Sequence, residues 1–267
     1  MNNTEIREVG IRDLPAVYEL RSSVLGETRE MTDDFFRLLP DMGTVLCLEE
    51  EGMVRGQISV LTGCEFIQAG KLRKPVCGCI CQLAVREDER KSDIRLQLLE
   101  AAEAKAFERE ASILFASCEE LSVTPDFREQ AGLTHPISRS MREVAVSDQE
   151  MTMKLSSTEY AMMRDGFLTG KNHFHPSFFT MEYLRLRCES LGGGLFASMS
   201  GICMCKKHGA VCELSEVISE NPAATAASVA FSLGCEKAVY ALPDPDGAPF
   251  LYADSAIPSD TVWNISF

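Results

Sequence analysis

The first half of the chain alternates between short apolar runs of strand length and longer stretches in which apolar residues recur every three to four positions. Val17 and Leu20 lie on such a helical face, and Asp13 stands before it at the N-cap position. Two apolar runs flank the turn Glu51-Gly52, which is typical of a β-hairpin. The predicted strands cover residues 6–9, 43–50, 54–61, 76–85 and 113–117, and the predicted helices begin near residue 13 and cover 33–39, 92–110 and 125–130.

The second half repeats this order of elements after a stretch near residues 145–157 that lacks clear periodicity. The repeat predicts two related modules of the α/β (α+β) class in tandem, each a mixed sheet flanked by helices. We place the two domains at residues 1–148 and 149–267. The elements predicted here are helical material over 157–191, a hairpin at 195–199 and 201–206, strands at 211–218 and 237–242, a helix at 221–233 and a strand-like tail at 261–267.

The charge and composition of the chain limit the kinds of binding partner that we expect. Among 267 residues there are 40 Asp and Glu but 26 Lys and Arg, which gives a net charge of −14. Such a surface repels phosphate backbones, so we expect no nucleic-acid partner, and it attracts cationic molecules. No apolar run approaches the roughly 18 residues of a membrane span, and the first residues lack a signal-peptide pattern. With eleven cysteines scattered through strand-like segments, these features predict a reduced, cytoplasmic protein without a membrane partner.

One segment carries a family resemblance. Residues 81–99, CQLAVREDERKSDIRLQLL, run from a predicted strand into a predicted helix. They resemble the acyl-coenzyme-A loop of the GNAT superfamily of N-acetyltransferases, Val-x-Pro-x-Tyr-Arg-Gly-x-Gly-Ile-Gly, with matches at Val85, Arg90 and Ile94. Residues 127–133, FREQAGL, resemble the family's Leu-Tyr-Glu-Lys-x-Gly-Phe. The resemblance covers residues 5–145, and a weaker one over 155–245 is similar to tandem-domain acetyltransferases of the enhanced-intracellular-survival type.

The resemblance implies acetyl-coenzyme A as co-substrate. In that family the diphosphate lies on backbone N–H groups at a helix N-terminus, and glycines allow its close approach. Here the three glycine positions hold Lys91, Asp93 and Arg95, of which the two cations favour a phosphate and the carboxylate opposes it. Backbone groups at the end of the strand would pair with the pantetheine arm. The implied cofactor-binding residues are Leu83, Ala84, Val85, Arg90, Lys91, Ser92, Asp93, Ile94 and Arg95.

The implied catalytic residues also depart from the family pattern. Arg128 occupies the position of the tyrosine that protonates the leaving thiolate, and a guanidinium can stabilise a thiolate but is a poor general acid. A base must deprotonate an ammonium acceptor, and the resemblance permits the α-carboxylate of Phe267 in this role, beside Glu49 on the predicted hairpin. We therefore assign Phe267, Arg128 and Glu49 as catalytic candidates. Further candidates for the base are Glu50, Glu213 and Glu216, and Gln82 on the predicted strand is a candidate for positioning water.

Three other patterns have simpler explanations. Cys77, Cys79 and Cys81 alternate on one strand, and we interpret them as buried apolar residues rather than thiolate metal ligands. The pair in His173-Phe174-His175 has no acidic or cysteine partner at ligand spacing, so we expect a surface loop and no metal site. The basic residues of 86–95 alternate with acidic ones. This segment can therefore be interpreted either as a solvated charged turn or as a phosphate site.

The sequence therefore predicts an acetyl-coenzyme-A-dependent N-acetyltransferase. Its acceptor would be a small-molecule or peptide amine, and the acidic surface favours a cationic one. The alternative is a catalytically inactive binding or scaffolding protein that retained the fold after its phosphate loop lost the glycines. A third class, a cysteine-based metal or redox protein, has less support. The sequence is also compatible with a homo-oligomer.

Overall fold

The structure is a computed structural model, and it describes residues 4–72, 74–87, 91–122, 125–148, 150–258 and 261–262, without the side chains of residues 91, 125 and 126. The chain folds into two compact units that are not continuous in sequence. The first unit comprises Met1–Phe66, Arg73–Ile137 and Pro249–Ile257, and the second comprises Ile67–Leu72, Ser138–Ala248 and Pro258–Phe267. The predicted domain division at residue 148 stays a prediction.

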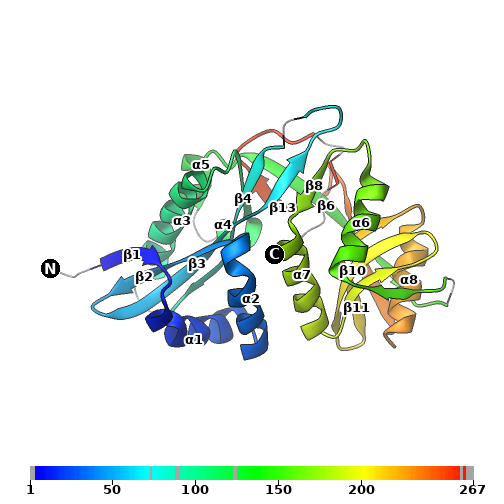
Figure 1. Cartoon of the computed structure of the whole chain (residues 1–267), viewed down its shortest axis with the longest axis horizontal. Helices are drawn as coiled ribbons and strands as arrows, with labels where there is room; N and C mark the ends of the chain where they lie inside the picture. Colours follow the sequence, from blue (N-terminus) through cyan, green and yellow to red (C-terminus); the bar gives the residue numbers. More distant parts are fainter. Residues whose placement is uncertain are drawn as a thin grey trace. The chain divides into compact units, whose positions relative to one another are not determined.

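The first unit is built on a sheet with the strand order β1-β2-β3-β4-β5-β13 (Figure 1). Its neighbouring strands are antiparallel except for the central pair β4 and β5, which is parallel. The strands are β1 (Thr4–Glu8), β2 (Gly43–Glu50), β3 (Met53–Ile67), β4 (Val76–Val85), β5 (Ile113–Ser117) and β13 (Ala248–Ala253). The helical segments are η1 (Ile11–Asp13), α1 (Leu14–Leu25), α2 (Arg29–Met42), α3 (Lys91–Glu108), α4 (Cys118–Ser122) and α5 (Pro125–Gln130).

Helices cover both faces of this sheet, as alternation along the strands requires. On β2, Leu46 and Leu48 belong to the core under α3, whereas Cys47 between them belongs to the core under α1. On β4, Val85 belongs to the core under α3, and Ala84 belongs to the core under α1. The predicted α/β class, a mixed sheet flanked by helices, is thus confirmed.

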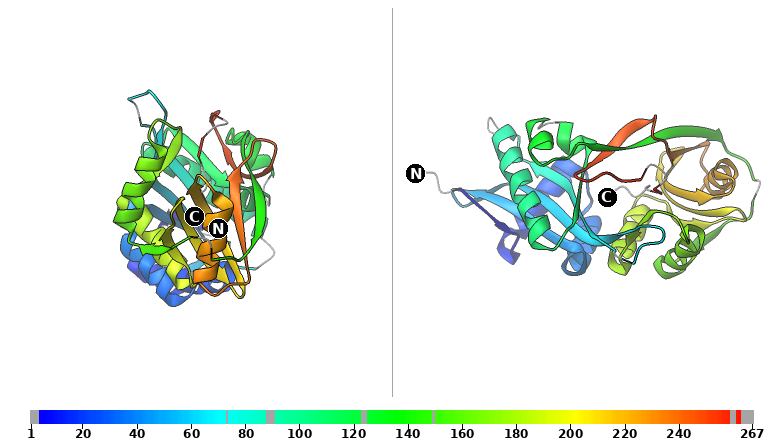
Figure 2. Two further views of the ribbon diagram at one scale, coloured as in Figure 1. Left: turned by 90° about the vertical axis from the view of Figure 1, so that its right-hand side faces the viewer. Right: turned by 90° about the horizontal axis from the view of Figure 1, so that it is seen from above.

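The second unit, whose elements run from green to orange in Figures 1 and 2, has the strand order β6-β12-β11-β10-β9-β7. Its central pair β11 and β12 is again parallel, and the other neighbours are antiparallel. Helices α6 and α7 cover one face, and α8 covers the other. The elements are β6 (His135–Ala145), β7 (Met153–Leu155), α6 (Ser157–Leu168), β8 (His173–Pro176), α7 (Phe178–Ser190), β9 (Gly194–Ala197), β10 (Gly201–His208), β11 (Val211–Ser219), α8 (Pro222–Ser232) and β12 (Lys237–Pro243).

The prediction of a surface loop for the histidine pair is wrong. The helical material predicted over 157–191 forms two helices, because Gly170 adopts a positive φ of 75° after α6 and the side chain of Ser177 caps a new helix at the backbone N–H of Thr180. Between the helices lies β8, which contains His173 and His175. His173 is buried at 6% exposure and Phe174 is fully buried, so the pair does not form a surface loop.

The capping prediction for the first helix needs a correction too. Asp13 occupies the N-cap position of α1, but its side chain makes no capping bond there. Its carboxylate instead accepts the backbone N–H of Gly10 at 2.8 Å and the guanidinium of Arg7 at 2.5 and 2.9 Å. The Arg7 guanidinium is the main cause that lowers the pKa of Asp13. The residue therefore ties η1 to β1.

All eleven cysteines lie in the described part of the chain as free thiols, and only Cys118 is not fully buried. The strand cysteines Cys77, Cys79 and Cys81 are buried, as expected for small apolar residues. Burial raises the pKa of the Cys47 thiol to about 11 and that of Cys188 to about 12. Among the described helices, none combines the length and the apolar character of a membrane span.

Candidate active site

The two central strands of the first unit separate at one end. β4 and β5 pair from Cys77–Ile113 to Ile80–Ala116. β4 continues for five residues to Val85, whereas β5 ends at Ser117 and the chain turns into α4. Backbone N–H and C=O groups inside such a fork lack their ladder partners and need others.

A β-bulge at the fork gives β4 its unusual backbone. Ser59 pairs with Cys81 and Gln57 pairs with Ala84, so β4 carries one more residue than β3 in this interval. Gln82 lies in the bulge with a φ of 57°, a conformation that non-glycine residues seldom adopt. Backbone of this kind persists only where its surroundings hold it in place.

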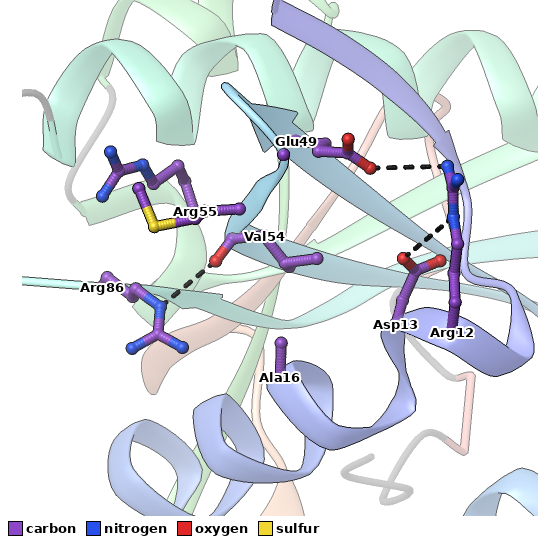
Figure 3. A pocket seen from close by; sticks show the side chains of 9 residues that line it. Arg12, Asp13, Ala16, Glu49, Val54, Arg55 and Arg86 are labelled. Atoms are coloured by element: carbon purple, nitrogen blue, oxygen red, sulfur yellow. Dashed lines mark hydrogen bonds and ion pairs between the residues drawn. The ribbon is translucent and has the colours of Figure 1, made fainter.

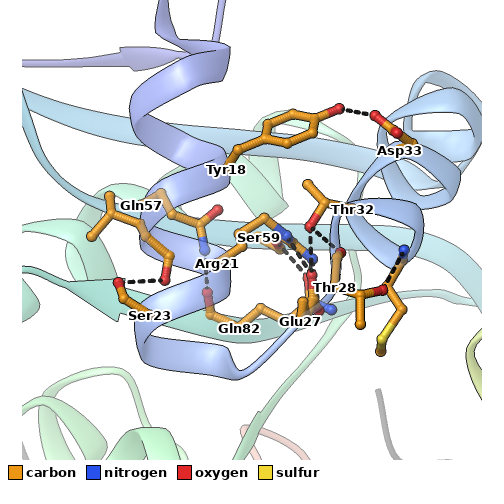
Figure 4. A network of polar contacts seen from close by, with 12 residues as sticks. Tyr18, Arg21, Ser23, Glu27, Thr28, Thr32, Asp33, Gln57, Ser59 and Gln82 are labelled. Carbon is orange, nitrogen blue, oxygen red and sulfur yellow. Dashed lines mark hydrogen bonds and ion pairs between the residues drawn. The ribbon is translucent and has the colours of Figure 1, made fainter.

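Buried polar side chains hold the bulge (Figure 4). The side-chain carbonyl of Gln82 accepts the Ser59 hydroxyl at 2.8 Å and Nη2 of Arg21 at 3.2 Å. The backbone carbonyl of Gln82 accepts Nε2 of Gln57 at 2.7 Å. Gln82, a candidate for positioning water, thus has its side-chain acceptor bound to the protein. Its structural effect is to fix the direction of its own N–H group.

Arg21 in turn is held by a buried ion pair. Its side chain has 0% exposure, and its Nε donates to Oε2 of Glu27 at 2.7 Å. Its guanidinium also lies 4.0 Å from the ring centre of Phe35. Breaking such a pair costs far more than its net contribution, because it leaves a buried charge unpaired. The pair therefore fixes α1 against the bulge of β4.

Glu120 of α4 reaches into the fork. Its Oε1 accepts the backbone N–H of Gln82 at 2.9 Å, while its Oε2 is buried and has no hydrogen-bond partner among the described residues. Burial raises the pKa of Glu120 to about 7, although the backbone N–H groups of Glu120 itself and of Gln82 oppose the rise. A carboxyl with such a pKa can accept or release a proton near neutral pH.

The implied cofactor-binding residues are distributed over the end of β4 and the start of α3. Leu83 is half-buried, and Ala84 and Val85 are buried on opposite faces of the sheet. In the first turns of α3, Ser92 and Asp93 are exposed, Ile94 is buried at 1% exposure, and Arg95 is half-buried. Arg90 lies outside the described residues, and Lys91 begins α3 with a side chain that is not described.

The implied catalytic residues do not meet in one place. Arg128 of α5 lies with its guanidinium carbon 5.0 Å from the ring centre of Tyr252 on β13. Its Nε is buried without a hydrogen-bond partner in the part of the chain that the structure describes. Glu49 bonds to Arg7 and forms an ion pair with Arg12 at 3.6 Å. Phe267 lies outside the described residues.

Glu49 lines a separate cavity of about 610 Å³ (Figure 3). The cavity lies between the start of α1, the β2–β3 hairpin and Arg86, and neither Gln82 nor Glu120 lines it. Arg86 is bound in turn to Glu19 at 2.7 Å and to the carbonyl of Val54 at 3.1 Å. The charged groups of this cavity thus neutralise one another, and it offers less reactive chemistry than the fork.

The other candidate bases are held in ion pairs. Glu50 is buried and lies 3.6 Å from Arg55. In the second unit, Glu213 lies 3.2 Å from Lys206, and the fully buried Glu216 contacts Arg164 at 3.0 Å. Each of these three carboxylates therefore already has a cationic partner within the protein.

Sequence reasoning missed Glu120 and Arg21, and both left a signal. Glu120 lies three residues after a predicted strand, and the carboxyl ends of parallel strands are where sites occur in open α/β sheets. Arg21 shares the buried face of α1 with Val17 and Leu20, and a charge on an apolar helix face requires a partner.

Comparison with known proteins defines a class for this fold. No protein-family model and no curated protein matches the chain. Solved structures do match, and their fold is that of the GCN5-related N-acetyltransferases, the GNAT superfamily. At 9–12% identity the similarity shows the fold alone.

Three structures illustrate the similarity. A probable N-acyltransferase from Enterococcus faecalis has a TM-score of 0.63 and 12% identity, with 94% of this chain and 72% of that one covered. The Eis1 protein from Mycobacterium abscessus has a TM-score of 0.57 and 10% identity, with coverage of 94% and 73%. A tandem GNAT protein from the clavulanic acid biosynthesis pathway has a TM-score of 0.58 and 11% identity, with coverage of 94% and 98%.

Proposed function

We propose that the protein transfers the acetyl group of acetyl-coenzyme A to the amine of a cationic small molecule or peptide, at the fork between β4 and β5. The observation that carries the proposal is the bulge at Gln82, whose N–H group is fixed toward a polar acceptor inside that fork. A fixed donor of this kind stabilises the negative oxygen that develops when an acyl group is attacked. The GNAT fold of the chain supports the same class of reaction.

Features at the start of α3 support a diphosphate site there. Ser92 and Asp93 are exposed, and the unpaired N–H groups of a helix N-terminus favour an anion. Nε of Arg95 is buried without a hydrogen-bond partner among the described residues, so this cation has donor capacity left. We propose that Arg95 contacts the diphosphate, with Arg90, Lys91 and Ser92, while the exposed Asp93 weakens the binding. The backbone of Leu83 and Val85 would pair with the pantetheine arm.

Glu120 is our candidate for the base. Acetyl-coenzyme A supplies a thioester, and in the net reaction the amine nitrogen bonds to the acetyl carbon, the carbon–sulfur bond breaks, and a thiol and one proton leave. Glu120 would take the proton from the ammonium form of the acceptor, since its pKa of about 7 matches neutral pH. A protonated carboxyl is a weaker acceptor, so protonation would also release the N–H of Gln82 toward the acyl oxygen.

The same contact favours a second candidate, a catalytically inactive protein with this fold. Glu120 occupies the N–H of Gln82, so the chain's own carboxylate fills the position that a substrate oxygen would need. Arg128 replaces the family's tyrosine, and the loop has lost its glycines. In this alternative the fork is closed, and the protein acts by binding a partner.

Variants of Glu120 separate the two functions. The measurements are thermal stability with millimolar acetyl-coenzyme A and thiol release in the presence of polyamines or lysine-containing peptides. For an enzyme, acetyl-coenzyme A stabilises the wild type by mass action. Glu120→Gln then keeps this shift but loses thiol release by roughly 10²-fold or more. Glu119→Gln, an exposed neighbour on α4, is the control and should change neither.

The catalytically inactive alternative, in which Glu120 closes the fork, predicts the opposite thermal shifts. Acetyl-coenzyme A would leave the wild type unchanged and would stabilise Glu120→Ala, in which the carboxylate is gone. Absence of any shift in the wild type overturns the transferase proposal, whichever acceptor is supplied.

A further inference from the structure

Three side chains with metal-binding atoms meet in the second unit. His173 and His175 are two positions apart on β8, so they lie on the same side of the strand, and Phe174 between them is fully buried. Asp165 lies on α6. One nitrogen of each imidazole and one carboxylate oxygen lie within 4.8 Å of one another. In the sequence Asp165 lies eight residues before His173, and it is the fold that brings the carboxylate beside the two imidazoles.

The ring of His173 is held in one orientation. Its Nδ1 lies 2.9 Å from the backbone carbonyl of Lys171, and a carbonyl can only accept, so Nδ1 carries the hydrogen. The lone pair is then on Nε2. Metal-ligating histidines are held in this way, with one nitrogen donating to a carbonyl or carboxylate and the other on the metal.

A buried arginine fixes the two elements that carry the cluster. Arg164 precedes Asp165 on α6, and its Nη1 donates to the backbone carbonyl of Phe174 at 2.6 Å. That carbonyl lies between the two histidines, so one hydrogen bond ties the helix to the strand at the cluster. The guanidinium also pairs with Glu216 at 3.0 Å, and this pairing offsets a positive charge that would otherwise repel a cation.

We propose that Asp165, His173 and His175 bind a divalent transition metal, with zinc(II) as the best match. Two imidazoles and one carboxylate suit zinc and its neighbours, whereas calcium and magnesium prefer oxygen ligands. Three protein ligands leave a position open for water or another small ligand. The Asp165 side chain is 51% exposed and that of His175 is 34% exposed, so an ion can reach the site from solvent. The site is independent of acyl transfer.

The histidines offer a matched control. His208 lies 3.5 Å from Glu213 in the same unit, an exposed histidine–carboxylate pair like His175 and Asp165. Within the described part of the chain, neither residue belongs to a cluster of three His, Cys, Asp or Glu side chains whose ligand atoms could share a metal ion. Variants Asp165→Asn, His175→Gln and His208→Gln, all at exposed or half-buried positions, can therefore be compared without disturbing the core.

The experiment is calorimetric titration of the untagged full chain with zinc chloride under reducing conditions, with cobalt(II) spectra to identify the ligands. We expect one site in the wild type and in His208→Gln. In Asp165→Asn and His175→Gln its affinity should fall by at least about tenfold, since loss of even an outer-sphere partner costs that much. Cobalt should show no thiolate charge-transfer band. The proposal is overturned by a wild type that binds no zinc, by unchanged affinity in both ligand variants, or by a thiolate band.

Discussion

The carboxylate of Glu120 accepts the backbone N–H of Gln82 at 2.9 Å, between two parallel strands that no longer pair. The first residue belongs to the short helix after β5, and the second to the bulge of β4. Each partner is unusual by itself, because one is a buried carboxyl and the other has a positive φ. In the function we propose, this contact controls access to the fork, and we expect it to make the stability of the protein depend on pH.

We predict that Glu120 makes the protein less stable as pH rises. Its pKa is raised by burial from 4.5 to about 7, so the folded state holds its proton more tightly than the unfolded state. Its favourable contribution is complete below pH 4.5 and is lost as pH rises through 7. The free energy of unfolding of wild type, relative to Glu120→Gln, should fall by about 3 kcal/mol between pH 4 and pH 8. Urea denaturation at several pH values measures this difference, and a flat difference contradicts it.

Arg21→Ala should be among the most destabilising substitutions in the first unit. It leaves the carboxylate of Glu27 buried without its partner, which costs about 3–5 kcal/mol. The control is Arg37→Ala, which removes an exposed pair with Asp34 and should cost about 1 kcal/mol or less. Both values come from chemical denaturation. Equal effects of the two variants would show that the buried pair has no special role.

Two glycines should respond to alanine in opposite directions. A Cβ at Gly43 would lie 2.1 Å from the backbone carbonyl oxygen of Val60, so Gly43→Ala should destabilise the protein by about 1–3 kcal/mol. A Cβ at Gly166 on α6 meets nothing within 4 Å, and Gly166→Ala should stabilise by about 0.5–1 kcal/mol because alanine is the better helix former. Thermal unfolding of the two variants beside wild type tests the pair.

Thiol titration should distinguish one cysteine from the rest. In the native protein Cys118 is half-buried, while the other ten cysteines are buried, and burial raises the pKa of thiols such as Cys47 to about 11. A thiol reagent at pH 8 should therefore modify Cys118 first, and the other ten should react only after denaturation. Cys118→Ser should abolish the fast phase. Several fast thiols in that variant would contradict the burial described here.

The sequence predicted the strands around the fork well, because they are apolar runs bounded by charged residues. The predicted strands 76–85 and 113–117 coincide with β4 and β5, and the helix predicted over 92–110 is α3 at Lys91–Glu108. The bulge at Gln82 could not be predicted, since it depends on the register of β4 against β3. Glu120 acquires its role only where two strands separate in space.

The same limit explains the histidine pair. From the sequence we predict no metal site, because the histidines have no acidic partner at ligand spacing. In the structure the partner is Asp165, which lies eight residues before His173. The two are brought together because a glycine ends one helix and the chain returns as a strand beside it. Ligand spacing shows a metal site when it follows a known motif, and one aspartate on a helix with two histidines on a separate strand matches no such motif.

The strand β13 sets the order in which the first unit can be completed. Residues 251–253 pair with 115–117 of β5, and the backbone and side chain of Asp254 bond to Leu114. During translation, most of this unit is therefore synthesised while the outer edge of β5 still lacks its partner strand. That edge can pair with other chains until more than one hundred further residues have been made. Nascent chains that stall before this point are expected to need chaperones or to aggregate.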